Sequence, residues 1–295
     1  MRKVTKIKRD VYQEVTDKVL DMMETHGTDW TNPITEHGWS FNGVTMQSYT
    51  GVNVLLLGSV GGGAFASYKQ WQSKGCQVMK GETGHQIIFF KKVVSADKVT
   101  GEENVYPMIK TYTVFSAHQV EGEYADQFKV PVEKKEELEQ NQDVQDWVAN
   151  TGAVVKIKNE DRAFYNPNDD YIQIPPQSRF NATGSSSAAE NYNSVLLHEL
   201  AHWTGHKSRL DRSIKNMFGT KDYAFEELVA ELASAFQCVK LGVTNEPRAD
   251  HAQYLNCWIK VLREDKKAIV KAASLAQKAV DYLDSLQSKE AEGVA

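Results

Sequence analysis

The chain has 295 residues, with 41% hydrophobic and 25% charged side chains, a balance typical of soluble globular proteins. Its apolar runs are far too short to cross a membrane, and the basic N-terminus is not followed by the apolar segment of a signal peptide. We therefore expect a cytoplasmic protein. The three cysteines form no CxxC pair, so neither a disulfide framework nor a thiolate zinc site is predicted.

Charge is distributed unevenly along the chain. The formal net charge is −5, yet residues 1–98 carry 12 Lys and Arg against 9 Asp and Glu. This mild basic bias is compatible with nucleic-acid binding by the front of the chain.

The first 120 residues predict a small α+β unit. Apolar side chains recur at helical spacing over 8–26, and Gly27 then provides a stop signal. The run Val52–Leu57 fits either a strand or a buried helix, and Phe65–Lys74 is predicted to be a short helix. Strands are predicted over 77–79, 85–94 and 111–120.

A strongly polar, acidic segment follows, and we interpret residues 131–145 as a linker between a first domain, 1–130, and a second domain, 146–295. The second domain is predicted to begin with a short helix and a short antiparallel sheet. Its expected strands are 154–158, 163–165 and 171–174, and its expected helices are 145–150, 188–203, 224–241 and one long helix over 250–286. The strand Tyr171–Ile174 is either internal or able to pair with an extended peptide.

The helix predicted over 188–203 carries an HExxH motif, His198-Glu199-Leu200-Ala201-His202. Residues four apart share a helix face, so both imidazoles can reach one cation, while Glu199 is rotated by about 100° toward a bound water. This is the arrangement of zinc-activated hydrolases, so we predict His198 and His202 as metal ligands and Glu199 as the catalytic base. The alternative is a buried helix whose histidines only satisfy hydrogen bonds.

A catalytic metal needs a third protein ligand. His206 is a poor candidate, because Gly205 is expected to end the helix and histidines on three successive turns would spread over about 12 Å. In the downstream segment AFEELVAEL, Glu227 is predicted to bind the metal and Glu231 to orient a ligating imidazole. Glu226 is the main competitor for the ligand position. A set of two histidines and a glutamate suits Zn²⁺, although Mn²⁺ or another divalent ion could occupy it.

The front half also has the ingredients of a site for single-stranded DNA, which combines aromatic stacking platforms with cations along the phosphates. The favoured residues are Tyr68, Lys69, Trp71 and Lys74, followed by Tyr49 and Lys80. Each of these aromatic rings is also a candidate for the hydrophobic core. The GSVGGG loop lacks the GK[ST] ending of a P-loop, so no nucleoside triphosphate site is expected.

Taken together, these segments resemble the ArdC-type antirestriction proteins, a plasmid-borne family similar to the N-terminal region of TraC-type primases. The resemblance covers most of residues 8–240. It rests on HELAHWTGHKSRLDR, YAFEELVAEL, DDYIQIPPQSRF, WTNPITEHGWSFNG, YTGVN, KGETGHQIIFFKK and YTVFSAHQVEG.

The resemblance implies a C-terminal zincin-like metallopeptidase domain in which His198, His202 and Glu227 bind the metal and Glu199 is the base. It also implies an N-terminal domain that binds single-stranded DNA with little sequence preference, and a protein that protects incoming plasmid DNA from host restriction during conjugation. Its partners would be single-stranded DNA and an unidentified protein substrate. The alternative function is a plain cytoplasmic metallopeptidase whose front domain recognises protein.

Overall fold

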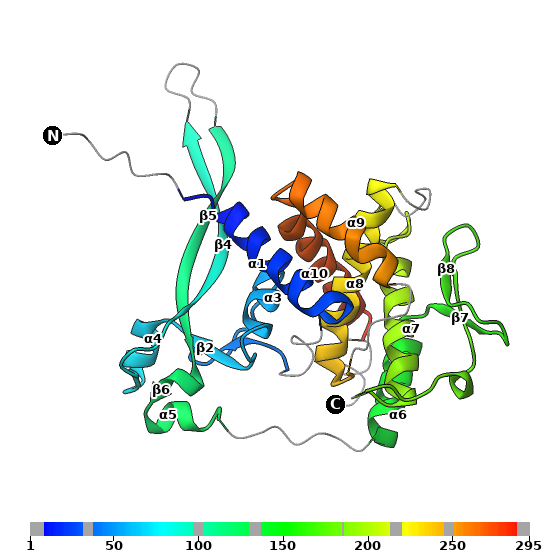
Figure 1. The fold of residues 1–295 in the computed structure, drawn as a ribbon, viewed down its shortest axis with the longest axis horizontal. Coiled ribbons are helices and arrows are strands. Elements are labelled where there is room, and N and C mark those ends of the chain that lie inside the picture. The colour runs from blue at the N-terminus through cyan, green and yellow to red at the C-terminus, as the bar shows by residue number, and fades with distance from the viewer. Residues whose placement is uncertain are drawn as a thin grey trace, which may run out of the picture.

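Small sheets and helices build an α+β fold, seen in a computed structural model that describes residues 9–31, 38–96, 103–129, 137–184, 186–212, 220–244 and 251–287 (Figure 1). The α-helices are α1 (Val11–His26), α3 (Val52–Gly58), α4 (Tyr68–Ser73), α5 (Glu123–Asp126), α6 (Glu137–Asn150), α7 (Ala188–Thr204), α8 (Lys221–Leu241), α9 (His251–Glu264) and α10 (Ala268–Ser285). The strands are β1 (Phe41–Asn42), β2 (Ala64–Ala66), β3 (Gln77–Val78), β4 (His85–Ala96), β5 (Glu103–Ser116), β6 (Val120–Glu121), β7 (Val154–Ile157), β8 (Phe164–Asn166) and β9 (Tyr171–Ile174). None of the helices in these ranges has the length and apolar character needed to cross a membrane.

The front sheet has the strand order β1-β2-β5-β4 and is dominated by its last two strands. β4 pairs antiparallel with β5 from His85↔Val114 out to Ala96↔Glu103, which produces a long two-stranded arm. Figure 1 shows this arm running upward past α1 and beyond the helices. The base of the arm is held by β2, which pairs antiparallel with β5.

The second sheet is mixed and has the order β7-β9-β8. β8 and β9 form the predicted antiparallel hairpin, but β7 pairs parallel with β9, so the expectation of an all-antiparallel sheet is corrected. Since β9 lies between two partners, it is an internal strand and has no free edge for a peptide. The connection through residues 158–163 and the β8–β9 hairpin each reverse the direction of the chain, so β9 runs parallel to β7.

The two helices of the predicted site, α7 and α8, are well capped and packed through small residues. Ser187 forms a capping box with Glu190 at the start of α7, which ends at Gly205 as expected. Thr220 caps α8, so this helix begins three residues before the predicted start. Across the interface, the Ser234 hydroxyl donates to the Ser194 carbonyl at 3.3 Å, which is possible because short side chains let the helix backbones approach.

The main hydrophobic core joins the two halves of the sequence. Val19, Met23 and Trp30 from the front pack in one cluster with residues of α8, α9 and α10. The Trp30 ring meets Trp258 of α9 edge to face, at 6.3 Å between centroids. The first and second halves therefore share one core. Helix α6 begins at Glu137, inside the segment 131–145 that we interpreted as a linker.

The expected long helix over 250–286 is broken into α9 and α10 at residues 265–267. Neither glycine nor proline marks the break. Instead, the Asp265 carboxylate accepts a hydrogen bond from Lys267 N at 2.9 Å, and the carbonyl of Lys266 accepts one from the Thr16 hydroxyl of α1 at 2.8 Å. The break thus depends on a partner 250 residues earlier in the chain.

The structure also decides the secondary structure of two segments in the front half. Val52–Leu57, which fitted strand or helix, lies in the fully buried helix α3, which follows Gly51 at a positive φ of 60°. The segment 65–74 is not one helix, because its first residues join the sheet as β2 and helix α4 begins only after the capping box of Ser67 and Gln70.

Asn53 connects α3 to the edge of the arm. Its side chain donates to the Ile88 carbonyl at 2.8 Å and accepts from the Ile88 amide at 2.9 Å. These are the hydrogen bonds that another strand would make at this edge of the sheet, here at a buried position. Removing this amide leaves one buried donor and one buried acceptor without their partner.

We therefore expect Asn53→Ala to lower the free energy of unfolding by about 2–4 kcal/mol, because each orphaned group costs about 1–3 kcal/mol. Urea unfolding of the full chain measures this. The control Asn168→Ala, at an exposed turn position, changes the stability by less than about 0.5 kcal/mol. An equal loss in both variants contradicts the structural role of Asn53.

Candidate metal centre

Two histidines of α7 and one glutamate of α8 converge in the interior. Nε2 of His198 and Nε2 of His202 lie 3.5 Å from Oε2 and Oε1 of Glu227, respectively. One ligand atom from each of these three residues lies within 4.8 Å of the others, which is close enough for all three to bind a single ion. The structure thus brings together the residues that the sequence predicted as ligands, in a donor set suited to a divalent metal.

Each imidazole also has a carboxylate on its other nitrogen. Nδ1 of His198 lies 3.7 Å from Glu231, and Nδ1 of His202 lies 3.3 Å from Glu226. A carboxylate at this position fixes the orientation of a ligating imidazole and leaves Nε2 for the metal. Glu226, which the sequence offered as a competing ligand, lies at this position toward His202, as Glu231 does toward His198.

These outer carboxylates are themselves held. Arg212 donates to both oxygens of Glu226, at 2.9 and 3.1 Å, and also to the Thr204 hydroxyl and the Ala201 carbonyl. The Thr31 hydroxyl donates to Glu231 at 3.4 Å. Thr31 lies 200 residues before Glu231, so the front of the chain reaches the outer layer of the centre. Spacing in the sequence contains no signal for this contact.

The ionisable side chains of the centre shift one another's pKa values. Burial alone would lower the pKa of His202, but attraction to Glu227 and hydrogen bonds with Glu226 and Glu227 outweigh burial and raise that pKa to about 10. Burial would raise the pKa of Glu227, but the two histidines hold it well below its usual range. The two histidines thus favour the anionic form of Glu227.

Glu199 of α7 contacts the second sheet. It is buried, and Oε2 accepts a hydrogen bond from the backbone N–H of Tyr165 in β8 at 2.9 Å. The rotation of about 100° between successive helix residues accounts for this separation from His198. Glu199 is thus placed next to the cluster without belonging to it, as expected of a base.

The strand that contacts Glu199 is fixed to the end of α7 by a polar cluster. The Tyr165 hydroxyl donates to Asp170 at 2.7 Å, and Arg209 donates to both residues. The guanidinium of Arg209 lies 3.9 Å from the centre of the Trp203 ring. A hydrogen bond from Arg209 lowers the pKa of Asp170 to about 2. Sequence reasoning did not assign this cluster, which positions β8 against the helix.

His206 lies outside the cluster. Its Nδ1 is 2.8 Å from the hydroxyl of Ser208 in the turn after α7. Gly205 ends α7, as predicted, so His206 leaves the helical face shared by His198 and His202.

The residues suggested for DNA binding divide into a buried group and an exposed group. Trp71 is fully buried and donates from Nε1 to the Phe115 carbonyl at 2.9 Å. Tyr49 is also buried and donates to the Phe65 carbonyl at 3.3 Å. Both rings lie in hydrophobic clusters of the core, and this burial argues against both residues as platforms for stacked bases. Aromatic spacing does not distinguish a core side chain from a stacking platform.

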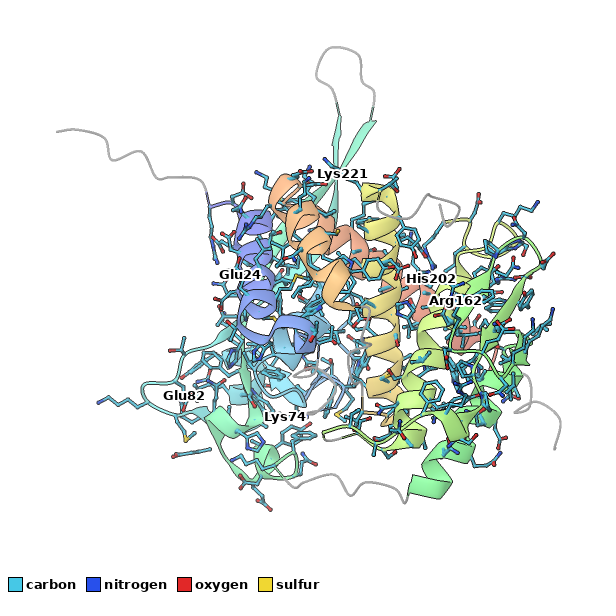
Figure 2. All side chains as sticks on the ribbon, turned by 45° about the vertical axis from the view of Figure 1, so that its right-hand side comes forward. Glu24, Lys74, Glu82, Arg162, His202 and Lys221 are labelled. Atoms are coloured by element: carbon cyan, nitrogen blue, oxygen red, sulfur yellow. The ribbon has the colours of Figure 1, made fainter. Side chains whose placement is uncertain are left out.

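The remaining four residues are exposed. Tyr68 and Lys69 lie on α4, Lys74 follows it, and Lys80 lies in the turn after β3. Figure 2 shows Lys74 below the centre of the view, well away from His202 beside α8. Their contact with DNA stays a prediction.

Both halves of the chain match families of known proteins. Residues 9–115 match the N-terminal domain of anti-restriction factor ArdC, and residues 142–275 match the zincin-like metallopeptidases. The fold is similar to the metal-free crystal structure of antirestriction ArdC protein from the R388 plasmid, with a TM-score of 0.78 and 35% identity over 94% of this chain and 98% of that chain. The chain belongs to the ArdC family of antirestriction proteins.

The chain is also similar to other known proteins. The Mn(II)-bound crystal structure of the same plasmid protein has a TM-score of 0.77 and 34% identity over 96% of this chain and 100% of that chain. Uncharacterized protein y4eC of Sinorhizobium fredii is 33% identical over 95% of this chain and 93% of its own length. DNA primase TraC of Escherichia coli is 32% identical over 97% of this chain, which spans only 28% of the primase.

The proposed ligand set predicts a much larger loss of metal affinity on substitution of Glu227 than on substitution of His206. We expect Glu227→Ala to weaken binding of Zn²⁺ or Mn²⁺ by more than about 100-fold, beyond the 10–100-fold typical of residues that only orient a ligand. His206→Ala should leave binding within about threefold of the unsubstituted protein. Metal content after dialysis against buffers of graded free metal measures both. Equal losses in the two variants refute the ligand set.

Proposed function

We propose that this ArdC-family protein acts in the cytoplasm as a zinc-dependent peptidase that also binds single-stranded DNA without sequence preference, and that it protects incoming DNA from host restriction during conjugation. The observation that carries the peptidase part is the convergence of His198, His202 and Glu227 beside the buried Glu199. The DNA part is supported by the match to the ArdC N-terminal domain and by the likeness to a segment of DNA primases.

The residues of the centre have distinct roles in this proposal. His198, His202 and Glu227 would hold a divalent cation, which supplies Lewis acidity and lowers the pKa of water. Glu231 and Glu226 keep the imidazoles oriented. Glu199, held by the Tyr165 amide, accepts a proton from the attacking water and delivers it to the leaving amine nitrogen.

Zinc is the proposed ion because two histidines and one carboxylate form a common ligand set of zinc hydrolases. The Mn(II)-bound form of the plasmid relative shows that the family fold accommodates another divalent ion. We propose an unfolded or extended polypeptide as the protein substrate.

Peptidase action depends on Glu199 as a base and not as a ligand. We expect Glu199→Gln to lower hydrolysis of casein by at least about 100-fold, because general acid–base catalysis contributes about 10²–10⁴-fold. Metal content should remain unchanged, since Glu199 does not belong to the ligand cluster. Equal hydrolysis by the two proteins, or none by either, contradicts the proposed peptidase.

DNA binding is tested with the full chain, because the front half shares its core with α8, α9 and α10. We expect the protein to bind a labelled oligothymidine at about 50 mM salt and to weaken as salt rises, by about 0.7 in the logarithmic slope for each phosphate contact. Fluorescence anisotropy measures both quantities. Absence of binding at low salt refutes the DNA-binding part of the proposal.

A further inference from the structure

One face of the β4–β5 arm is aromatic and open to solvent. The register pairs Ile87 with Tyr112 and Phe89 with Lys110, so these four side chains share a face. Ile87 is 2% exposed and packs into the protein, whereas Tyr112, directly opposite it, is 49% exposed, and Phe89, two residues farther along β4, is 47% exposed. Their rings meet edge to face at 5.4 Å between centroids.

Exposed apolar surface is concentrated on this arm. Of the eight large apolar side chains exposed in the described part of the chain, four belong to β4 and β5: Phe89, Phe90, Met108 and Tyr112. Rings that are half exposed offer faces on which further rings can stack. A sheet face of this kind is unusual unless it binds something.

The charge of the arm identifies the occupant. Lys110 lies opposite Phe89, and Lys91 lies opposite Met108, so two exposed cations alternate with the rings on the same face. Residues 85–96 and 104–120 contain no Asp or Glu, although the whole chain has a net charge of −5. A basic, aromatic surface suits a polyanion with flat bases better than it suits an apolar protein partner.

A cavity of about 530 Å³ adjoins Phe89, between β4, the loop 45–51 and α10. Its polar lining includes the amides of Asn42, Gln47, Gln70 and Gln277. Gln277 accepts a hydrogen bond from Gly51 N at 3.0 Å, so the wall toward α10 is preformed. Amide side chains offer both donors and acceptors, and the volume lies within the roughly 300–1,000 Å³ of small-ligand sites. The aromatic face therefore leads to a space that admits the edge of a base.

We propose that the arm face formed by Phe89, Lys91, Lys110 and Tyr112 is the surface on which bases of single-stranded DNA stack. The two rings carry the bases, and the two lysines contact the flanking phosphates. This inference rests on the proposed DNA binding. Under this proposal, the principal contacts with DNA lie on the arm and not on the exposed residues around α4.

The test uses the full chain and a fluorescein-labelled oligothymidine of about 30 nucleotides. We expect Phe89→Leu with Tyr112→Leu to weaken binding by at least about tenfold with little change in its salt dependence, because stacking is not ionic. Lys91→Ala with Lys110→Ala should weaken binding and reduce the logarithmic salt slope by about 1.4, or about 0.7 for each lost phosphate contact.

A matched control removes a similar set of side chains elsewhere. The triple variant Tyr68→Leu, Lys69→Ala and Lys74→Ala should change affinity by less than about threefold. Unchanged melting temperature and metal content show that each variant is folded. In addition, photocrosslinking with oligonucleotides that carry 5-iodouracil should label peptides containing residues 85–91 or 108–112.

The outcomes separate the inference from the function on which it rests. If the unsubstituted protein binds no oligothymidine at low salt, the proposed DNA binding itself fails. If it binds but the arm variants bind equally well, or crosslinks are confined to residues 68–80, the DNA binding stands and the arm is not its site.

Discussion

The structure depends on the neutralisation of buried charge along one helix. Glu226, Glu227 and Glu231 are all buried on α8, and an unpaired buried carboxylate is strongly destabilising. Each is matched: Glu227 by two imidazoles, Glu226 by His202 and Arg212, and Glu231 by His198 and Thr31. The packing of α7 on α8 and the turn that carries Arg212 are therefore part of the metal centre.

The shared core connects the front of the chain to the same centre. Trp30 packs on Trp258 of α9, and its neighbour Thr31 contacts Glu231. Ile88 of the arm belongs to the core that contains α8 and α10, and Asn53 holds its backbone. The two family models match separate stretches of the sequence, whereas the folded protein shares one core across them. Because of this integration, the function of either half is best measured in the full chain.

Much of the metal centre was determined by local sequence. The four-residue spacing of His198 and His202, the neighbouring Glu199 and the capping residues of α7 act within one helix, where geometry follows directly from spacing. The pairing of Glu227 and Glu231 with that helix was also predictable, since both lie on one face of the next helix. Glu226 was harder to assign, because adjacent residues on a helix differ only by rotation.

The tertiary structure decided what depends on distant partners. Thr31 and Arg212 enter the centre only through packing, and the break before α10 depends on Thr16 of α1. Likewise, Trp71 and Tyr49 are core residues while Phe89 and Tyr112 are exposed, although all four are aromatic residues in similar local sequence. Sequence spacing determines which side chains share a helix or strand face, but burial is set by which other elements cover that face.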